Sequence, residues 1–121
     1  MCAADFEKMT LLGEGGYGKV WLVKKQTTGK VYAMKVLEKS KIKSQKALEH
    51  TITEKQVLIN NSPFLLHLHF SFQTPTKLYM ITDYLAGGDM FFHLSKKNGS
   101  GFSSRVGRFF AAELVLALEH L

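Results

Sequence analysis

Cysteine is almost missing from this sequence, in which Cys2 is the only one among 121 residues. A single thiol near a terminus can form no internal disulfide and offers no cluster of metal ligands. Proline is scarce as well, at two residues, and no Gly-, Ser- or Pro-rich tract marks a disordered linker. These absences predict one folded domain in a reducing, intracellular setting.

Long apolar runs and N-terminal targeting signals are also lacking. No stretch approaches the roughly 20 apolar residues that span a bilayer. The amino end does not have the basic, apolar and small-residue order of a secretory signal. We therefore expect a cytoplasmic or nuclear protein with no transmembrane segment.

Positive charge is what the chain has in excess, with a formal net charge of +6 at pH 7. Its lysines fall in short separated groups, Lys24 with Lys25 and the residues from Lys39 to Lys46. A nucleic-acid surface would instead present one basic stripe interleaved with aromatic side chains. We interpret the charge as a solvated basic face that favours an anionic ligand, and we expect no nucleic-acid partner.

Five segments have the alternating or apolar patterning of β-strands, and turns rich in glycine or containing proline separate them. They cover residues 6–12, 19–24, 31–37, 65–72 and 77–83. The sequence therefore predicts a sheet of five strands, the first two joined by a glycine-rich turn at 13–18.

Between residues 44 and 60 the hydrophobic period becomes helical. Glu54 lies on the stripe that is expected to face the protein, so its carboxylate needs a cationic partner. The apolar and small members of this expected stripe are Ala47, Leu48, Thr51, Ile52, Leu58 and Ile59.

Two more helices are predicted towards the carboxyl end. Asp89 can cap a short helix that runs to about Asn98, and Ser103 or Ser104 can cap a long one that runs to Leu121. The long helix is apolar around most of its circumference, which is typical of a buried helix.

The glycine motif Gly13-x-Gly15-x-x-Gly18 has several interpretations. A dinucleotide fingerprint needs a helix directly after the last glycine, but Val20 and Trp21 continue a strand pattern. A P-loop needs Gly-Lys-Ser/Thr, which Val20 breaks. A glycine-rich turn over phosphates fits the longer pattern G-x-G-x-x-G-x-V, and an ordinary hairpin turn is the alternative.

Lys35 is the first residue that separates these alternatives. It lies in the apolar strand Ala33-Met34-Lys35-Val36-Leu37, the setting of the kinase third-strand lysine. A charge on an edge strand is the simpler explanation. The helix that follows, however, carries Glu54 inward, and an inward cation and an inward anion can satisfy each other.

Four segments, in their order along the chain, resemble the small lobe of a protein kinase of the AGC group. This group includes the cyclic-AMP-dependent kinase catalytic subunit and the ribosomal-protein kinases. The resemblance extends over essentially the whole chain. It implies an α+β fold: a five-stranded antiparallel sheet with one principal helix, then a hinge and the first helices of the large lobe. The matching segments are residues 12–20, 32–35, 49–55 and 78–88.

The resemblance also implies domain limits of about 1–82 for the small lobe, 83–88 for the hinge and 89–121 for the start of the large lobe. It implies a serine/threonine kinase that uses ATP and Mg²⁺, with Lys35 holding the α- and β-phosphates and Glu54 orienting Lys35. The implied ATP-binding residues are Leu12, Gly13, Glu14, Gly15, Gly16, Tyr17, Gly18, Lys19, Val20, Ala33, Lys35, Thr82, Asp83, Leu85 and Asp89.

Within this set, the resemblance implies an adenine slot formed by Leu12, Val20 and Ala33 and closed at the back by Thr82. The carbonyl of Asp83 and the N–H of Leu85 would bond the adenine edge. Asp89 stands where the family usually has glutamate, which contacts the ribose and a basic residue of the protein substrate, and its arm is shorter.

Four residues are implied to be regulatory. His50 resembles the helix histidine that AGC kinases direct at the phosphorylated activation loop, although an exposed helix histidine would look the same. Lys39, Ile42 and Leu78 match the pocket that accepts an aromatic motif from the kinase's own C-terminal tail, although core packing would explain Leu78 equally well.

The segments H-R-D-x-x-x-x-N and D-F-G, which orient the substrate hydroxyl and hold Mg²⁺ in kinases, do not occur in the sequence. We therefore expect a truncated chain that is inactive alone, with a catalytic loop within roughly a dozen residues beyond Leu121 in an intact gene. A non-catalytic, kinase-like interaction module that acts through the surfaces around His50 and Leu78 is the alternative.

Overall fold

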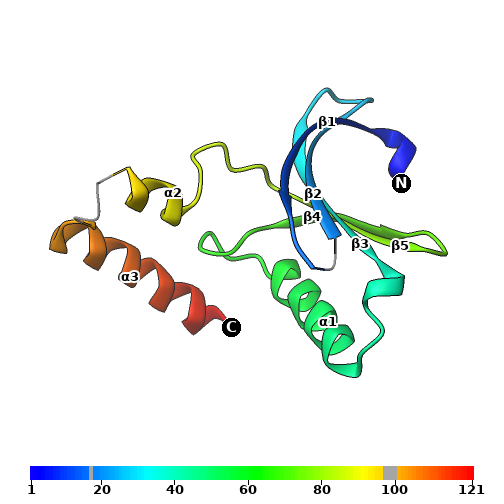
Figure 1. The fold of residues 1–121 in the computed structure, drawn as a ribbon. Helices are drawn as coiled ribbons and strands as arrows, with labels where there is room; N and C mark the ends of the chain where they lie inside the picture. Colours follow the sequence, from blue (N-terminus) through cyan, green and yellow to red (C-terminus); the bar gives the residue numbers. More distant parts are fainter. Residues whose placement is uncertain (17, 97–100) are drawn as a thin grey trace. The chain divides into compact units, whose positions relative to one another are not determined.

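The chain forms two compact units in the computed structural model (Figure 1). The first unit comprises Met1–Asn61 and Leu65–Tyr84, and the second comprises Ser62–Phe64 and Leu85–Leu121. The structure describes residues 1–16, 18–96 and 101–121.

A five-stranded antiparallel sheet in the order β1-β2-β3-β5-β4 forms most of the first unit. With helix α1 (Gln45–Ile59) it confirms the predicted α+β fold. The strands are β1 (Phe6–Glu14), β2 (Gly18–Lys25), β3 (Val31–Glu38), β4 (Leu68–Gln73) and β5 (Lys77–Thr82).

The strand limits differ from the prediction by more than one residue at two places, the end of β1 and the start of β4. The β1–β2 ladder continues to the pair Glu14 and Lys19, so the turn is shorter than residues 13–18. Backbone pairing between the two strands extends them, and glycine gives no side-chain pattern from which this could be read. Strand β4 begins at Leu68 rather than at residue 65, because residues 63 and 64 still form a turn, in which the Phe64 N–H donates to Ser62 Oγ at 3.2 Å.

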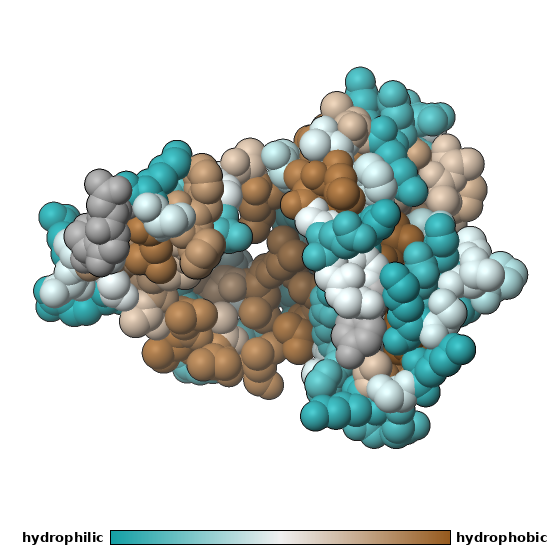
Figure 2. Space-filling view, in the orientation of Figure 1, coloured by the Kyte–Doolittle hydropathy of each residue, from teal (hydrophilic) through white to brown (hydrophobic). Residues whose placement is uncertain are grey.

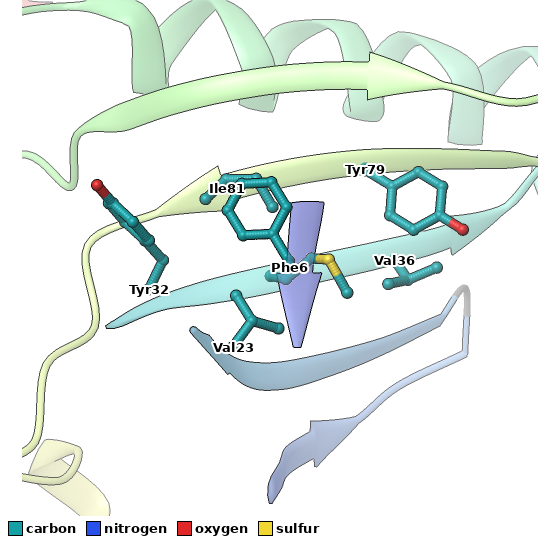
Figure 3. Close-up of a cluster of buried hydrophobic side chains, with 7 residues drawn as sticks. Phe6, Val23, Tyr32, Val36, Tyr79 and Ile81 are labelled. Atoms are coloured by element: carbon teal, nitrogen blue, oxygen red, sulfur yellow. The ribbon is translucent and has the colours of Figure 1, made fainter. Parts of the chain in front are cut away.

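The hydrophobic core lies on one face of the sheet, and Figure 3 shows most of its members. Phe6, at the start of β1, lies 6.2 Å from both Phe70 and Phe72 of β4, measured between ring centroids. Since β1 and β4 are the two edge strands, the sheet must be strongly curled. The buried members are Phe6, Val23, Tyr32, Met34, Val36, Tyr79 and Ile81.

Helix α1 begins directly after Ser44, near the predicted start of the helical pattern, and Ser44 caps it: its Oγ accepts the Ala47 N–H at 3.1 Å. The prediction is wrong for half of the six residues that were expected to face inward, because Leu48, Ile52 and Ile59 are 42%, 49% and 57% exposed. The periodicity contains two neighbouring apolar stripes, and only packing against the sheet decides which one is buried. The half-buried or buried positions of the helix are Ala47, Thr51, Glu54, Val57 and Leu58.

The second unit contains the helices α2 (Met90–Ser95) and α3 (Ser104–His120). Both begin at predicted caps: Asp89 Oδ1 accepts the Phe92 N–H at 2.7 Å, and Ser103 Oγ accepts the Val106 N–H at 3.3 Å. The predicted end of the short helix near Asn98 lies outside the described residues. Among the residues that the structure does describe, none of this unit is fully buried, and Figure 2 shows brown, apolar surface over it.

The longest of the described helices, α3, has 17 residues. None of them combines the length and the apolar character that crossing a bilayer requires.

Candidate functional site

The register of the sheet places a set of side chains on the face opposite the hydrophobic core. Directly paired residues of antiparallel strands share a face, so each cross-strand row of pairs is also a row of neighbouring side chains. The residues of β3 that alternate with its core residues therefore lie on this second face, each in a row with one residue of β2 and one residue of β5. The rows are Leu22–Ala33–Thr82, Val20–Lys35–Met80 and Gly18–Leu37–Leu78.

Lys35 and Glu54 form an ion pair on this face, with Lys35 Nζ 2.6 Å from Glu54 Oε1. The two side chains are 35% and 40% exposed, so solvent screens their attraction and the pair adds little to stability. Its effect is on geometry, because it holds a flexible ammonium at a fixed place between β3 and α1. The structure thus brings together the two residues that the sequence predicted to pair.

The glycines of the motif divide into two kinds. A Cβ atom on Gly18 would lie 1.8 Å from the Val36 carbonyl oxygen, so only glycine fits where β2 approaches β3. A Cβ on Gly13, Gly15 or Gly16 would meet nothing within 4 Å. Open space therefore lies over these three glycines, where a ligand could approach the backbone. Tyr17, another predicted site residue, lies outside the described residues.

A cavity of about 310 Å³ lies between the glycine-rich turn and Lys35, at the lower limit of typical small-molecule pockets. Leu37 also lines it and was not predicted, although its place two residues after Lys35 on the same strand face was a usable signal. The complete lining is Gly13, Glu14, Gly15, Gly16, Gly18, Val20, Lys35 and Leu37.

Other predicted ATP-binding residues lie around rather than in this cavity. Leu12 is 42% exposed and lies at an irregularity of the β1–β2 ladder. Lys19 lines a separate, smaller groove together with Trp21. Ala33 and Thr82 are cross-strand partners, and Thr82 is buried with its Oγ1 3.4 Å from the Asp83 carbonyl oxygen, to which it donates.

Asp83, the first residue after β5, is held by β4. Its Oδ1 lies 2.5 Å from Nε2 of His69, and its N–H donates to the His67 carbonyl at 3.3 Å. Neither histidine was among the predicted site residues. The sequence carried no signal for them, because the contact depends on how β4 pairs with β5.

Leu85 and Asp89, the last two predicted ATP-binding residues, belong to the second unit. Leu85 is 72% exposed. Asp89 uses one carboxylate oxygen to cap α2, as described above, and its side chain is therefore partly committed to the helix.

The predicted regulatory residues lie elsewhere on the first unit. His50 is exposed on α1, and Ile42 is half-buried just before that helix. Lys39 donates from Nζ to Gln73 Oε1 at 2.7 Å, which links the end of β3 to β4. Leu78 is half-buried and pairs with Leu37. No group of three or more His, Cys, Asp or Glu side chains able to hold a metal ion occurs in the described parts of the chain.

Comparison with known proteins gives one family and many relatives. A family model described as the protein kinase domain matches residues 6–121. The serine/threonine-protein kinase SCH9 of Saccharomyces cerevisiae is 50% identical over 121 residues, which cover 97% of this chain and 14% of SCH9.

Two further relatives have comparable sequence identity to this chain. The serine/threonine-protein kinase sck1 of Schizosaccharomyces pombe is 54% identical over 97% of this chain and 17% of its own length. The serine/threonine-protein kinase sgk-1 of Caenorhabditis elegans is 45% identical over 98% of this chain and 26% of its own length. The chain thus spans between 14% and 26% of the length of these relatives.

Proposed function

The chain belongs to the protein kinase family, among relatives of the AGC type, and we propose that it forms the ATP-binding portion of a serine/threonine kinase. The observation that carries the proposal is the ion pair of Lys35 with Glu54 below a glycine-rich turn with open space over it. A hairpin turn without a ligand would need neither a cation aimed into the cavity nor the helix that fixes it.

Lys35 is proposed to bind the α- and β-phosphates of ATP. Lys35 lines the cavity, and open space at the Cβ positions of Gly13, Gly15 and Gly16 would let phosphate oxygens approach their backbone. Glu54 keeps the ammonium directed at this position and leaves its other hydrogens free to donate.

The adenine ring is proposed to bind against the row that ends in Thr82, with Val20 and Ala33 on the same face. These side chains are small or apolar, which suits a flat aromatic ring. The carbonyl of Asp83 and the N–H of Leu85 are proposed to bond the adenine edge. Asp89 is proposed to contact the ribose with its second carboxylate oxygen.

Phosphoryl transfer is proposed for a kinase that contains this segment, with ATP and Mg²⁺ as cofactors and a protein serine or threonine as acceptor. Mg²⁺ supplies charge neutralisation at the phosphates. Its usual protein ligands come from the segments H-R-D-x-x-x-x-N and D-F-G, which the 121 residues do not contain. The proposal for this chain itself is therefore nucleotide binding, without a step through the metal.

Partners and setting are part of the same proposal. The acceptor serine or threonine would have basic residues nearby, because Asp89 offers a carboxylate towards them. An aromatic motif from a C-terminal tail would bind at Lys39, Ile42 and Leu78, and His50 would meet a phosphorylated activation loop. A cytoplasmic or nuclear location accords with the supply of ATP in those compartments.

Nucleotide titration of the Lys35→Met variant tests the proposal. We expect its affinity for ADP to fall about tenfold or more, because a charge-assisted bond to phosphate is lost. Its affinity for adenosine should stay within about twofold, since adenosine has no phosphate. Titrations followed by NMR resolve even millimolar dissociation constants.

Lys24→Met is the matched control, because Lys24 is an exposed lysine of β2 and its loss changes the net charge by the same amount. It should leave both affinities unchanged. Equal ADP affinity in the Lys35→Met and Lys24→Met variants would contradict the assignment. A wild-type chain that binds neither ADP nor adenosine would instead favour the non-catalytic interaction module.

A further inference from the structure

Strand β4 contains a β-bulge at His69. In the β4–β5 ladder Leu68 pairs with Thr82 and Phe70 pairs with Ile81, so His69 is the extra residue. A bulge of this kind interrupts the alternation of a strand and can redirect a side chain. Here the imidazole of His69 reaches the carboxylate of Asp83, at 2.5 Å.

The contact has a defined donor. An ionised carboxylate can only accept hydrogen bonds, so Nε2 of His69 must carry the hydrogen, whether the ring is neutral or charged. Neighbouring rings restrict the imidazole. Those of Tyr32 and His67 lie 5.1 Å and 4.6 Å from it, both edge to face. The imidazole therefore packs against two neighbouring rings as well as contacting Asp83.

Asp83 is fixed through two different groups as a result. Its carboxylate accepts from His69, and its N–H donates to the His67 carbonyl at 3.3 Å. One contact comes from β4 and the other from the residue directly before it, so together they hold Asp83 where the chain leaves β5. The side chains of the pair are 29% and 46% exposed, and a bond at that exposure is worth more for orientation than for stability.

We propose that His69 is a positioning residue for nucleotide binding: it clamps the side chain of Asp83 and so presets the backbone carbonyl of that residue for the adenine edge. The inference rests on the proposed function, in which this carbonyl accepts a hydrogen bond from adenine. Presetting the acceptor lowers the entropy lost on binding and raises affinity without direct contact between His69 and the ligand.

The test compares His69→Leu with His69→Gln in the full 121-residue chain. His69→Leu removes the donor and should weaken binding of adenosine and of ADP by the same factor, about threefold to tenfold. His69→Gln keeps an N–H donor at similar reach and should restore affinity to within about twofold of wild type. Inorganic tripolyphosphate, which lacks adenine, should bind all three proteins equally.

The pattern across ligands separates positioning from simple loss of structure. A destabilised chain would lose affinity for tripolyphosphate as well, and Ser71→Ala, at an exposed position of β4, is the control for strand substitutions in general. Amide exchange of Asp83 and Tyr84, measured without nucleotide, should be faster in His69→Leu and normal in His69→Gln.

Two results would overturn the inference in distinguishable ways. Equal adenosine affinity in wild type and His69→Leu, with ADP binding still dependent on Lys35, would remove the role of His69 and leave the proposed function standing. No binding of adenosine or ADP by the wild-type chain would overturn the proposed function, and the role of His69 with it.

Discussion

The two units of the chain differ most in what they bury. Every fully buried side chain among the described residues belongs to the first unit, whereas the second unit exposes large apolar residues such as Phe91, at 78%, and Leu118, at 68%. Both units contain well-capped helices. Good local helix signals are therefore not enough to make a core, which requires surfaces that close on one another.

The difference predicts that the first unit unfolds cooperatively and that the second is held mainly by local interactions. Burial of apolar surface is the main favourable term in folding. A structure without it opens locally at little cost, as hydrogen exchange would detect.

The largest expected effect comes from truncating a buried side chain. Ile81→Ala, at 0% exposure in the first unit, should lower the free energy of unfolding by about 2–5 kcal/mol. Leu118→Ala, in the second unit, should change it by less than about 0.5 kcal/mol. Trp21 is the only tryptophan and packs against the core of the first unit, so denaturation followed by its fluorescence measures how each variant affects the unfolding of the first unit. Similar losses would remove the contrast between the units.

A smaller effect is expected from adding one methyl group at the glycine-rich turn. Gly18→Ala should lower the free energy of unfolding by about 1–3 kcal/mol, because its Cβ would lie 1.8 Å from the Val36 carbonyl oxygen. Gly15→Ala places its Cβ in open space and should be nearly neutral. The same fluorescence measurement applies. A neutral Gly18→Ala would mean that the strands part more easily than the structure indicates.

The helix caps offer a matched pair across the units. Ser44→Ala removes the cap of α1 and should lower the stability seen by Trp21 fluorescence by about 1 kcal/mol. Ser103→Ala removes the cap of α3 and should leave that transition unchanged while amide exchange in α3 becomes faster. Ser44→Asp keeps a capping oxygen and serves as the control. A change in the Trp21 transition upon Ser103→Ala would show that the two units unfold together.

The smallest effect is a pH dependence at the amino end. The backbone N–H of Cys2 donates to the Asp5 carboxylate at 2.7 Å and holds the pKa of that carboxyl below its ordinary value. Because the folded pKa is the lower one, the contribution is present above the ordinary value and is lost as pH falls below about 4. The Cys2 amide should then shift and exchange faster in NMR spectra. Asp5→Asn should abolish this pH dependence, and an unchanged profile would contradict it.

The sequence predicted the central features of the fold and of the candidate site because their signals are local. The apolar strand around Lys35 indicated an inward cation, and the helical period placed Glu54 towards the protein, so their pairing could be inferred from two short segments. Four segments in family order then identified the fold.

What the sequence did not predict depends on contacts between distant segments. The bulge at His69 arises from the pairing of β4 with β5, and no pattern within β4 indicates it. The exposed Leu48 and Ile52 of α1 were expected to face inward, because periodicity locates apolar stripes without saying which one meets the sheet. Such features follow from packing, which a one-dimensional pattern does not contain.

The alternation of β3 also limits how this segment can change over generations. Tyr32, Met34 and Val36 belong to the core, while Ala33, Lys35 and Leu37 lie on the opposite face, which carries the proposed site. Substitutions on one face leave the side chains of the other face unchanged, so the ligand preference of the proposed site can change while the hydrophobic core is retained. Insertion or deletion of one residue would shift the register of β3 and move the side chains of each set to the opposite face of the sheet. We therefore expect β3 to diversify by replacement of residues and to tolerate no change in length.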